Sequence, residues 1–302
     1  MSDPAATVGD MTANGFRALV GTSSWTKPSW NKADGFYQSD VSKAGELRYF
    51  ADRIPTVEVN ATWHNLQRPA TYRRWHDQVH ERFVFSIKAW RGITHERPLR
   101  GSEREVAMFL ASGPLLLREK LGPILWQFPK TFGFDSAVLE AFLAGLPRSV
   151  DEARTFIARH GGTVDAELAA VPDRALRHAI EVRNRGFAQP RYLEMLREHD
   201  IAAVLTNFAD QPIADVVTTD LVYVRFDDAL RLFPTGHSTA QLEEHAARIR
   251  GWLERADVYF YFDDQDYRTN PTQRQPFDAI DLQRLIGGDG PVPGAGLQTS
   301  LW

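Results

Sequence analysis

The chain has 302 residues, of which 43% are hydrophobic and 25% charged, a balance typical of folded globular proteins. It contains no cysteine, which excludes disulfides, cysteine-ligated metal centres and thiol nucleophiles. The formal net charge of −4 and the pI of about 6.2 give no overall attraction to nucleic acids or to anionic membranes.

The two ends of the sequence differ from its middle. The first residues are small and polar and lack the basic start and apolar core of a secretory signal, and no run of about 18 apolar residues occurs. The last residues are rich in glycine and proline. We therefore expect a cytoplasmic protein with no membrane partner, with a flexible tail over 1–16, one domain over 17–286 and a second tail over 287–302.

Short apolar runs recur along the middle of the chain. Each run is rich in β-branched or aromatic residues and is bounded by turn formers or charges, a pattern that predicts a strand. Eight such runs occur: Arg17–Thr22, Thr56–Asn60, Phe83–Lys88, Pro123–Phe128, His178–Arg183, Ile201–Thr206, Leu221–Phe226 and Asp257–Phe262.

Helical patterns separate most of these runs. Ser102 with Glu105, and Ser238 with Gln241, have the spacing of a capping box and predict the starts of helices over 102–120 and 239–255. Other helical patterns cover 42–52, 69–79, 192–199 and 277–286. The long connection from Pro129 to Arg177 holds two or three further helical stretches, which we interpret as an enlarged helical layer within one domain.

The alternation of strands and helices predicts a parallel sheet. Eight strands in this length predict an α/β fold, a single-domain TIM-type (β/α)8 barrel with an enlarged connection between strands four and five. The alternative is a doubly wound open sheet, which usually carries a glycine-rich phosphate loop after an early strand; the sequence has none.

Polar residues occur late in the predicted strands. Alternate strand residues point into a barrel, and active sites lie at the carboxyl ends of the strands. The alternation predicts that apolar side chains face the helices and that one interior layer carries Glu58, Lys88, Gln127, Glu181, Arg183, Asn207 and Arg225. Asp263 follows the eighth run, where the pattern does not fix the phase. Because buried charges are costly unless paired, this layer is either a functional site or a mutually neutralising polar centre.

The loops after the predicted strands mix aromatic residues with Arg, Asn and Ser. That mixture suits a sugar or nucleobase with a phosphate nearby, although Trp25 and Trp30 could instead pack over the barrel mouth. We take Glu58, Glu181 and Lys88 as candidate catalytic residues. The candidate substrate-binding residues are Asn60, Trp25, His95, Gln127, Arg183, Asn207, Arg225 and Asp263.

No metal or other cofactor is expected. The sequence lacks HExxH and GxSxG motifs. Glu58 and Glu181 with His64 or His95 could in principle bind a metal, but the neighbouring Lys and Arg side chains would repel a cation. A glycosidase-like pair of Glu58 and Glu181 would rest on residue type alone.

Several segments taken together resemble one family. GTSSW, PTVEVNATW, FVFSIKAWRGITHERPL, LGPILWQFP, AIEVRNRGF, LVYVRF and YFDD are similar to motifs of the YecE-like family, domain of unknown function 72, from about Val20 to Ile286. The resemblance implies a TIM-type barrel and no defined reaction. The chain departs from the family pattern at Asp263 and Asp264, where the family usually has Asn-Asn, and at Asp227 and Asp228, where His-Gly is common. Both departures make the mouth more acidic.

Three functional hypotheses follow. The first is an enzyme, a hydrolase or isomerase acting on a phosphorylated, glycosidic or nucleotide substrate, in which Lys88, Arg183 and Arg225 bind the anion and the glutamates act as acid or base. The second is a nucleic-acid-binding module with tryptophans stacking on bases and Arg91, Arg97 and Arg183 on phosphates, which the negative net charge disfavours. The third is a catalytically silent barrel with a structural polar centre, since a fold alone does not define a function.

Overall fold

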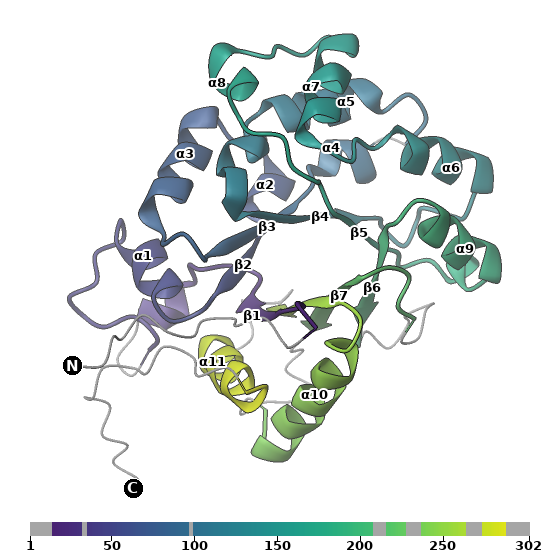
Figure 1. Ribbon diagram of the computed structural model, residues 1–302. Helices are drawn as coiled ribbons and strands as arrows, with labels where there is room; N and C mark the ends of the chain where they lie inside the picture. The colour runs from purple at the N-terminus through teal and green to yellow at the C-terminus, as the bar shows by residue number, and fades with distance from the viewer. Residues whose placement is uncertain are drawn as a thin grey trace, which may run out of the picture.

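The strands close into a barrel. The computed structural model describes residues 14–31, 35–96, 99–207, 216–227, 237–263 and 274–287, with the side chain of Asp227 outside this description. Within these ranges eight parallel strands follow one another in sequence order, and the last pairs with the first. Helices surround the strands (Figure 1). The predicted TIM-type barrel is confirmed.

Each predicted apolar run overlaps a strand, although β4, β7 and β8 extend one or two residues beyond their runs. The strands are β1 (Ala18–Thr22), β2 (Thr56–Val59), β3 (Val84–Lys88), β4 (Leu121–Gln127), β5 (His178–Glu181), β6 (Ala202–Thr206), β7 (Leu221–Asp227) and β8 (Asp257–Asp263). Gly21 of β1 illustrates how tightly they close, because a Cβ atom there would collide with the carbonyl oxygen of Thr56 on β2.

Helices follow the strands around the barrel. They are α1 (Glu46–Ala51), α2 (Ala61–His64), α3 (Pro69–Gln78), α4 (Arg91–Thr94), α5 (Glu103–Ala111), α9 (Pro190–Glu198), α10 (Thr239–Trp252) and α11 (Gln275–Leu285), with 3-10 turns η1 (Pro28–Asn31), η2 (Pro114–Lys120) and η3 (Arg185–Phe187). The capping box of Ser238 with Gln241 forms at the start of α10, as predicted.

The predicted helix over 102–120 is wrong in two respects. It is interrupted after α5, because Gly113 has a φ of 124°, a value that favours glycine, and Pro114 then starts η2. The capping box of Ser102 with Glu105 does not form: the Ser102 side chain makes no cap hydrogen bond, and its backbone ψ of 5° lies outside the extended conformation typical of an N-cap.

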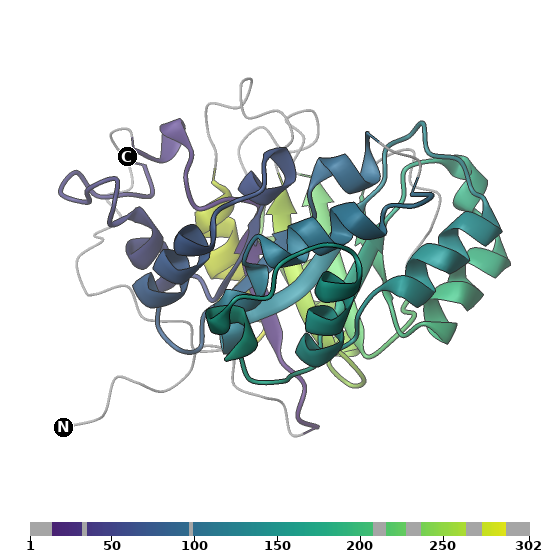
Figure 2. The same ribbon diagram turned by 90° about the horizontal axis from the view of Figure 1, so that it is seen from above.

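The connection between β4 and β5 is enlarged, as expected. It contains α6 (Ser136–Gly145), α7 (Val150–Arg159) and α8 (Ala166–Ala169), each capped by a side chain: Asp135, Ser149 and Asp165. α7 packs on α5, and α6 packs on α9. Figure 2 shows these helices as an added layer outside the barrel. The two predicted tails, 1–16 and 287–302, lie almost wholly outside the described residues.

The barrel interior is filled in layers. Outward-facing residues such as Val57 and Val59 join the large core beneath the helices, whereas a separate inner cluster fills the barrel. Above its apolar part, the hydroxyl of Tyr261 is hydrogen-bonded to Thr56 and Ser86 at 2.8 and 2.7 Å. The charged layer lies above these tyrosine contacts, at the carboxyl ends of the strands. Across the described ranges, no helix combines the length and apolarity needed to span a membrane.

Candidate active site

Six strands bring polar side chains to the carboxyl end of the barrel. Glu58 and Glu181 point inward and are fully buried, which confirms the predicted strand phase. The other members of this buried layer are Lys88, Gln127, Arg225 and Asp263. Asp263, whose phase the sequence left open, is the last residue of β8 and faces the interior.

Arg225 is at the centre of this layer. Its Nε atom donates to both carboxylate oxygens of Glu58, at 3.1 and 2.9 Å. Its Nη1 atom donates to Glu181, and its Nη2 atom donates to Asp263 at 2.7 Å. One guanidinium is therefore hydrogen-bonded to three carboxylates, whose combined negative charge its single positive charge offsets only in part. Among the residues that the structure describes, no group of three or more acidic or histidine side chains is arranged to hold a metal ion.

Further hydrogen bonds hold the two glutamates. Tyr223 donates to Glu58 at 2.7 Å. Gln127 and Arg183 both donate to Oε1 of Glu181, at 3.2 and 2.7 Å. Each carboxylate thus has charged and neutral donors, which compensates the cost of burying it.

The pKa values of the two glutamates are shifted in opposite directions. Burial raises the pKa of Glu58, and the nearby Arg225 offsets this only in part. Burial also acts to raise the pKa of Glu181, but Arg225, Arg183 and Lys88 together outweigh it and the pKa is lowered. Glu181 is therefore the carboxylate of the pair that stays ionised more readily, and Glu58 is the one that holds a proton more readily.

A cavity of about 520 Å³ opens above this layer, within the range of roughly 300–1,000 Å³ that is typical of ligand sites. It is lined by Ser23, Ser24, Thr26, Lys27, Pro28, Asn60, Trp63, His64, Lys88, His95, Gln127, Arg183, Arg225 and Asp263. Glu58 and Glu181 are not part of this lining. They lie beneath the cavity floor, in contact with Arg225.

Lys88 and His95 both have a lowered pKa in this site. Burial, with Arg225, lowers the pKa of Lys88 to about 8. Burial, with Lys88 and Arg183, lowers the pKa of His95 to about 4, so its imidazole is neutral at pH 7. His95 Nδ1 is hydrogen-bonded to the hydroxyl of Thr94 at 2.8 Å, which leaves Nε2 as the ring nitrogen available to a ligand.

Two of the predicted binding residues are not among the residues that line the cavity. Trp25 packs edge-on against Trp75 of α3 with ring centroids 5.3 Å apart, and it does not line the cavity. Asn207, just after β6, is half-buried and also lies outside the lining. Trp30 is only 1% exposed, so it presents no free ring face at the mouth, whereas Trp25 is half-buried. Arg97, Asp228, Asp264 and the side chain of Asp227 fall outside the described part of the chain.

Seven lining residues are absent from the predicted set: Ser23, Ser24, Thr26, Lys27, Pro28, Trp63 and His64. Most belong to the loops after β1 and β2 that the sequence pattern draws attention to. Lys27 is the least visible in sequence, since it is a single lysine in a loop, and its Nζ donates to Gln275 of α11 at 2.6 Å. A loop side chain can be assigned to a site only when the partner that orients it is known.

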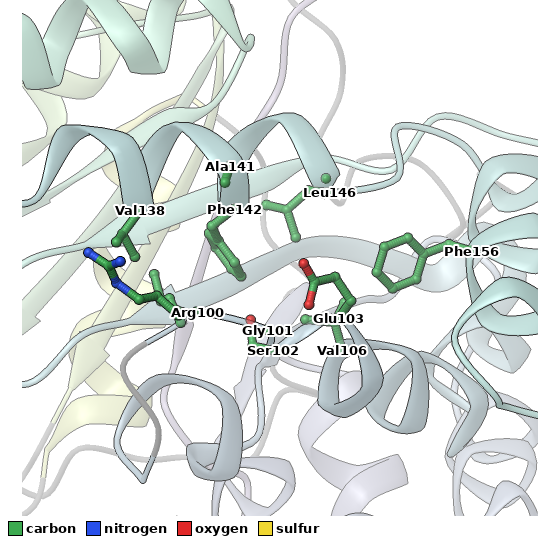
Figure 3. Close-up of a pocket in the computed structure, with 12 residues that line it drawn as sticks. Arg100, Gly101, Ser102, Glu103, Val106, Val138, Ala141, Phe142, Leu146 and Phe156 are labelled. Atoms are coloured by element: carbon green, nitrogen blue, oxygen red, sulfur yellow. The ribbon is translucent and has the colours of Figure 1, made fainter.

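A second cavity, of about 70 Å³, lies in the outer helical layer between α5, α6 and α7. Figure 3 shows Phe142, Leu146 and Phe156 around it, with Glu103 and Arg100 nearby. It is small and mostly apolar, and none of its lining residues belongs to a strand, so it is not the candidate active site.

Comparison with known proteins identifies the family. The model of the family described as "Protein of unknown function DUF72" matches residues 19–294. The chain belongs to the DUF72 family. The curated UPF0759 protein YunF of Bacillus subtilis (strain 168) is 30% identical over 108 residues, 34% of this chain and 38% of YunF. The match therefore spans well under half of that relative.

Solved DUF72 structures share the barrel. A DUF72 family protein from Thermotoga maritima MSB8 superposes with a TM-score of 0.66 at 18% identity, covering 89% of this chain and 98% of that one. One from Enterococcus faecalis V583 gives a TM-score of 0.61 at 19% identity, with 89% and 97% covered. At this identity the likeness establishes the fold and leaves the chemistry to be argued from the site.

Proposed function

We propose that this DUF72 protein is an enzyme acting on a small phosphate-bearing substrate, such as a sugar phosphate, held in the 520 Å³ cavity. The charge of the cavity wall is the observation that carries the proposal. Among the described lining residues, four are cationic, Lys27, Lys88, Arg183 and Arg225, and one, Asp263, is a carboxylate. Even with Glu58 and Glu181 beneath the floor, cations exceed carboxylates, so an anion is favoured there.

The arginines differ in what they offer a ligand. Arg225 directs Nε and both Nη atoms at carboxylates, so it contributes charge to the cavity more than hydrogen bonds. The Arg183 side chain is 20% exposed and lines the opening while its Nε holds Glu181. We assign the phosphate to the space beside Arg183 and Lys88, because guanidinium and ammonium groups are the usual phosphate partners.

The rest of the wall suits hydroxyl groups. Oδ1 of Asn60 and Nε1 of Trp63 are buried with no hydrogen-bond partner among the described protein groups, although the Asn60 amide donates to the carbonyl of Ser23 at 2.9 Å. Buried polar atoms without partners are uncommon because they cost free energy. Two residues of the cavity lining thus each carry a buried polar atom without a partner, one acceptor and one donor, which supports a polyhydroxylated ligand, whose hydroxyls both donate and accept.

The acid–base roles follow from which groups reach the cavity. Lys88 lines the cavity, so it is the candidate that can exchange a proton with a substrate directly. Glu58 and Glu181 act through Arg225, whose position they fix, and are positioning residues in this proposal. His95 supplies a neutral imidazole at the rim.

Calorimetric titration with inorganic phosphate tests the anion site. The wild-type protein should bind one phosphate, and Arg183→Gln should weaken binding about tenfold, equivalent to about 1.4 kcal/mol. Arg191→Gln is the matched control, because Arg191 is an exposed arginine on α9 that pairs with Glu198 at 2.9 Å, and it should bind like the wild type. Absence of binding to the wild type, or equal loss in both variants, would overturn the anion site.

Turnover separates an enzyme from a silent barrel. A panel of sugar phosphates is followed by proton and phosphorus NMR with the wild-type protein and with Lys88→Met. Conversion of at least one compound by the wild type and not by the variant is the expected result. A protein that binds phosphate and converts none of the panel would instead support the catalytically silent barrel.

A further inference from the structure

Lys88 differs from the other buried lysine for which a full set of contacts is described. Lys120, at the end of η2, is buried and its Nζ donates to the carbonyls of His76 and Val79 at 2.7 and 2.8 Å. Lys88 is likewise buried, with 8% of its surface exposed, yet within the described structure its Nζ makes no hydrogen bond and no ion pair within 4 Å. Its amine lies 5.1 Å from the ring centre of Trp63 and lines the cavity.

The carboxylates near Lys88 are already engaged. Glu58, Glu181 and Asp263 each accept a hydrogen bond from Arg225, and Glu181 accepts others from Gln127 and Arg183. A buried lysine with a purely structural role would be expected to have such a partner, because a buried ammonium is costly without one. The arrangement instead leaves an amine in the cavity wall without a counterion in contact.

Charged groups from every neighbouring element face this amine. Burial is the largest influence, Arg225 on β7 acts with it, and Glu58, Asp263 and Glu181 on β2, β8 and β5 oppose it. Arg183 and His95 share the cavity wall with Lys88. With a pKa of about 8, roughly a tenth of the Lys88 amine is unprotonated at pH 7, against well under a thousandth for an ordinary lysine.

From this geometry we propose that Lys88 forms an imine with the carbonyl carbon of its substrate, so that the substrate is a phosphate-bearing aldehyde or ketone. The phosphate part of this inference rests on the proposed function above. Arg183, on the same wall, would hold the phosphate while the amine attacks the carbonyl group. Lysine amines with a lowered pKa in a desolvated site are the nucleophiles that form such Schiff bases.

The step balances without an added co-reactant. The nitrogen lone pair of Lys88 forms a C–N bond as the C=O π bond breaks, and the oxygen takes up a proton to give a carbinolamine. The nitrogen loses its two protons in the course of the reaction, and the oxygen leaves as water carrying two. The product is a C=N bond, and no atom is oxidised or reduced.

Reductive trapping with pyridoxal 5′-phosphate tests the inference on the wild-type protein. This phosphate-bearing aldehyde is incubated with the protein, sodium borohydride delivers hydride to any imine carbon, and the modified lysine is mapped by peptide mass spectrometry. Lys88 should be modified at least tenfold faster than Lys43, an exposed lysine that pairs with Glu46 at 2.8 Å. Lys88 modification should decline as the pH falls below 8, because the neutral amine is lost, and Lys88→Met should remove it.

The outcomes separate this inference from the proposed function. Inorganic phosphate should slow the trapping at Lys88, and pyridoxal without phosphate should react more slowly. If calorimetry shows phosphate binding but Lys88 is modified no faster than Lys43, the proposal that Lys88 forms an imine is refuted, and the proposed anion site is retained. If Lys88 is trapped equally by both aldehydes and phosphate gives no protection, the reactive amine stands and its phosphate-bearing substrate is wrong. Mapping in the wild type requires no variant to fold.

Discussion

Arg225 donates from Nη2 to the carboxylate of Asp263 at 2.7 Å, and both side chains are almost completely buried. This contact joins the end of β7 to the end of β8 and engages the one edge of the guanidinium that the two glutamates leave open. As a result, the charged centre has two parts with different tasks. Arg225 with its three carboxylates forms a hydrogen-bonded floor, and Lys88 with Arg183 lines the cavity above it.

Replacing Arg225 should chiefly destabilise the fold. Arg225→Gln would leave three buried carboxylates without their common cation, and breaking buried ion pairs in this way costs about 3–5 kcal/mol. Urea denaturation followed by fluorescence measures the loss. Arg183→Gln is the comparison, because Glu181 keeps Arg225 and Gln127, and its loss should be under about 1 kcal/mol. Equal losses in the two variants would show that the centre is not divided.

Replacing Asp263 by asparagine should strengthen anion binding. Asp263→Asn keeps a hydrogen-bond acceptor for Arg225 but removes the one carboxylate among the described lining residues. The affinity for phosphate should therefore rise about fivefold, equivalent to about 1 kcal/mol of relieved repulsion, with a small loss of stability. Calorimetry on the variant and the wild type gives the comparison. Weaker binding in Asp263→Asn would mean that the anion does not occupy this cavity.

The two glutamates should respond oppositely to pH. Because burial raises the pKa of Glu58 above its unfolded value, its contribution favours folding at low pH and is lost as the pH rises through the folded pKa. Glu181 has a lowered pKa, so its contribution is present above the unfolded pKa and is lost as the pH falls.

Isosteric amides test this difference. Glu58→Gln imitates the protonated form, so relative to the wild type it should gain stability as the pH is raised from 5 to 8. Glu181→Gln removes a required charge and should be the more destabilising variant at pH 8. Urea denaturation of both variants at the two pH values gives the answer. If the stability of Glu58→Gln relative to the wild type falls between pH 5 and pH 8, the assignment of a raised pKa to Glu58 is contradicted.

Much of the fold could be predicted because the strands alternate clearly. In β3, Phe85 and Ile87 face the helices while Ser86 and Lys88 face inward, so the pattern alone fixes the phase. In β8 the alternation is between tyrosine inside and phenylalanine outside, two aromatic types of similar hydrophobicity, and the phase of Asp263 could not be derived. The missing cap at Ser102 depends on backbone geometry that a residue pattern does not encode.

The sequence predicts which residues make up the charged layer, but it does not predict which of them form ion pairs with one another. Sequence placed Glu58, Lys88, Glu181 and Arg225 in one layer, and the structure agrees. It could not show that Arg225 satisfies all the carboxylates and thereby leaves Lys88 without one, because that depends on the register of β2, β5, β7 and β8. Whether Trp25 faces a ligand or Trp75 is likewise decided by packing in a loop that has no periodicity.

Anomalous diffraction from crystals soaked in tungstate, a heavy analogue of phosphate, tests the anion site most directly. A peak inside the cavity, within hydrogen-bond distance of Lys88 Nζ and the Arg183 guanidinium and lost in Arg183→Gln crystals, is the predicted result. Occupied tungstate sites confined to the outer surface, with none in the cavity at saturating concentration, would contradict it.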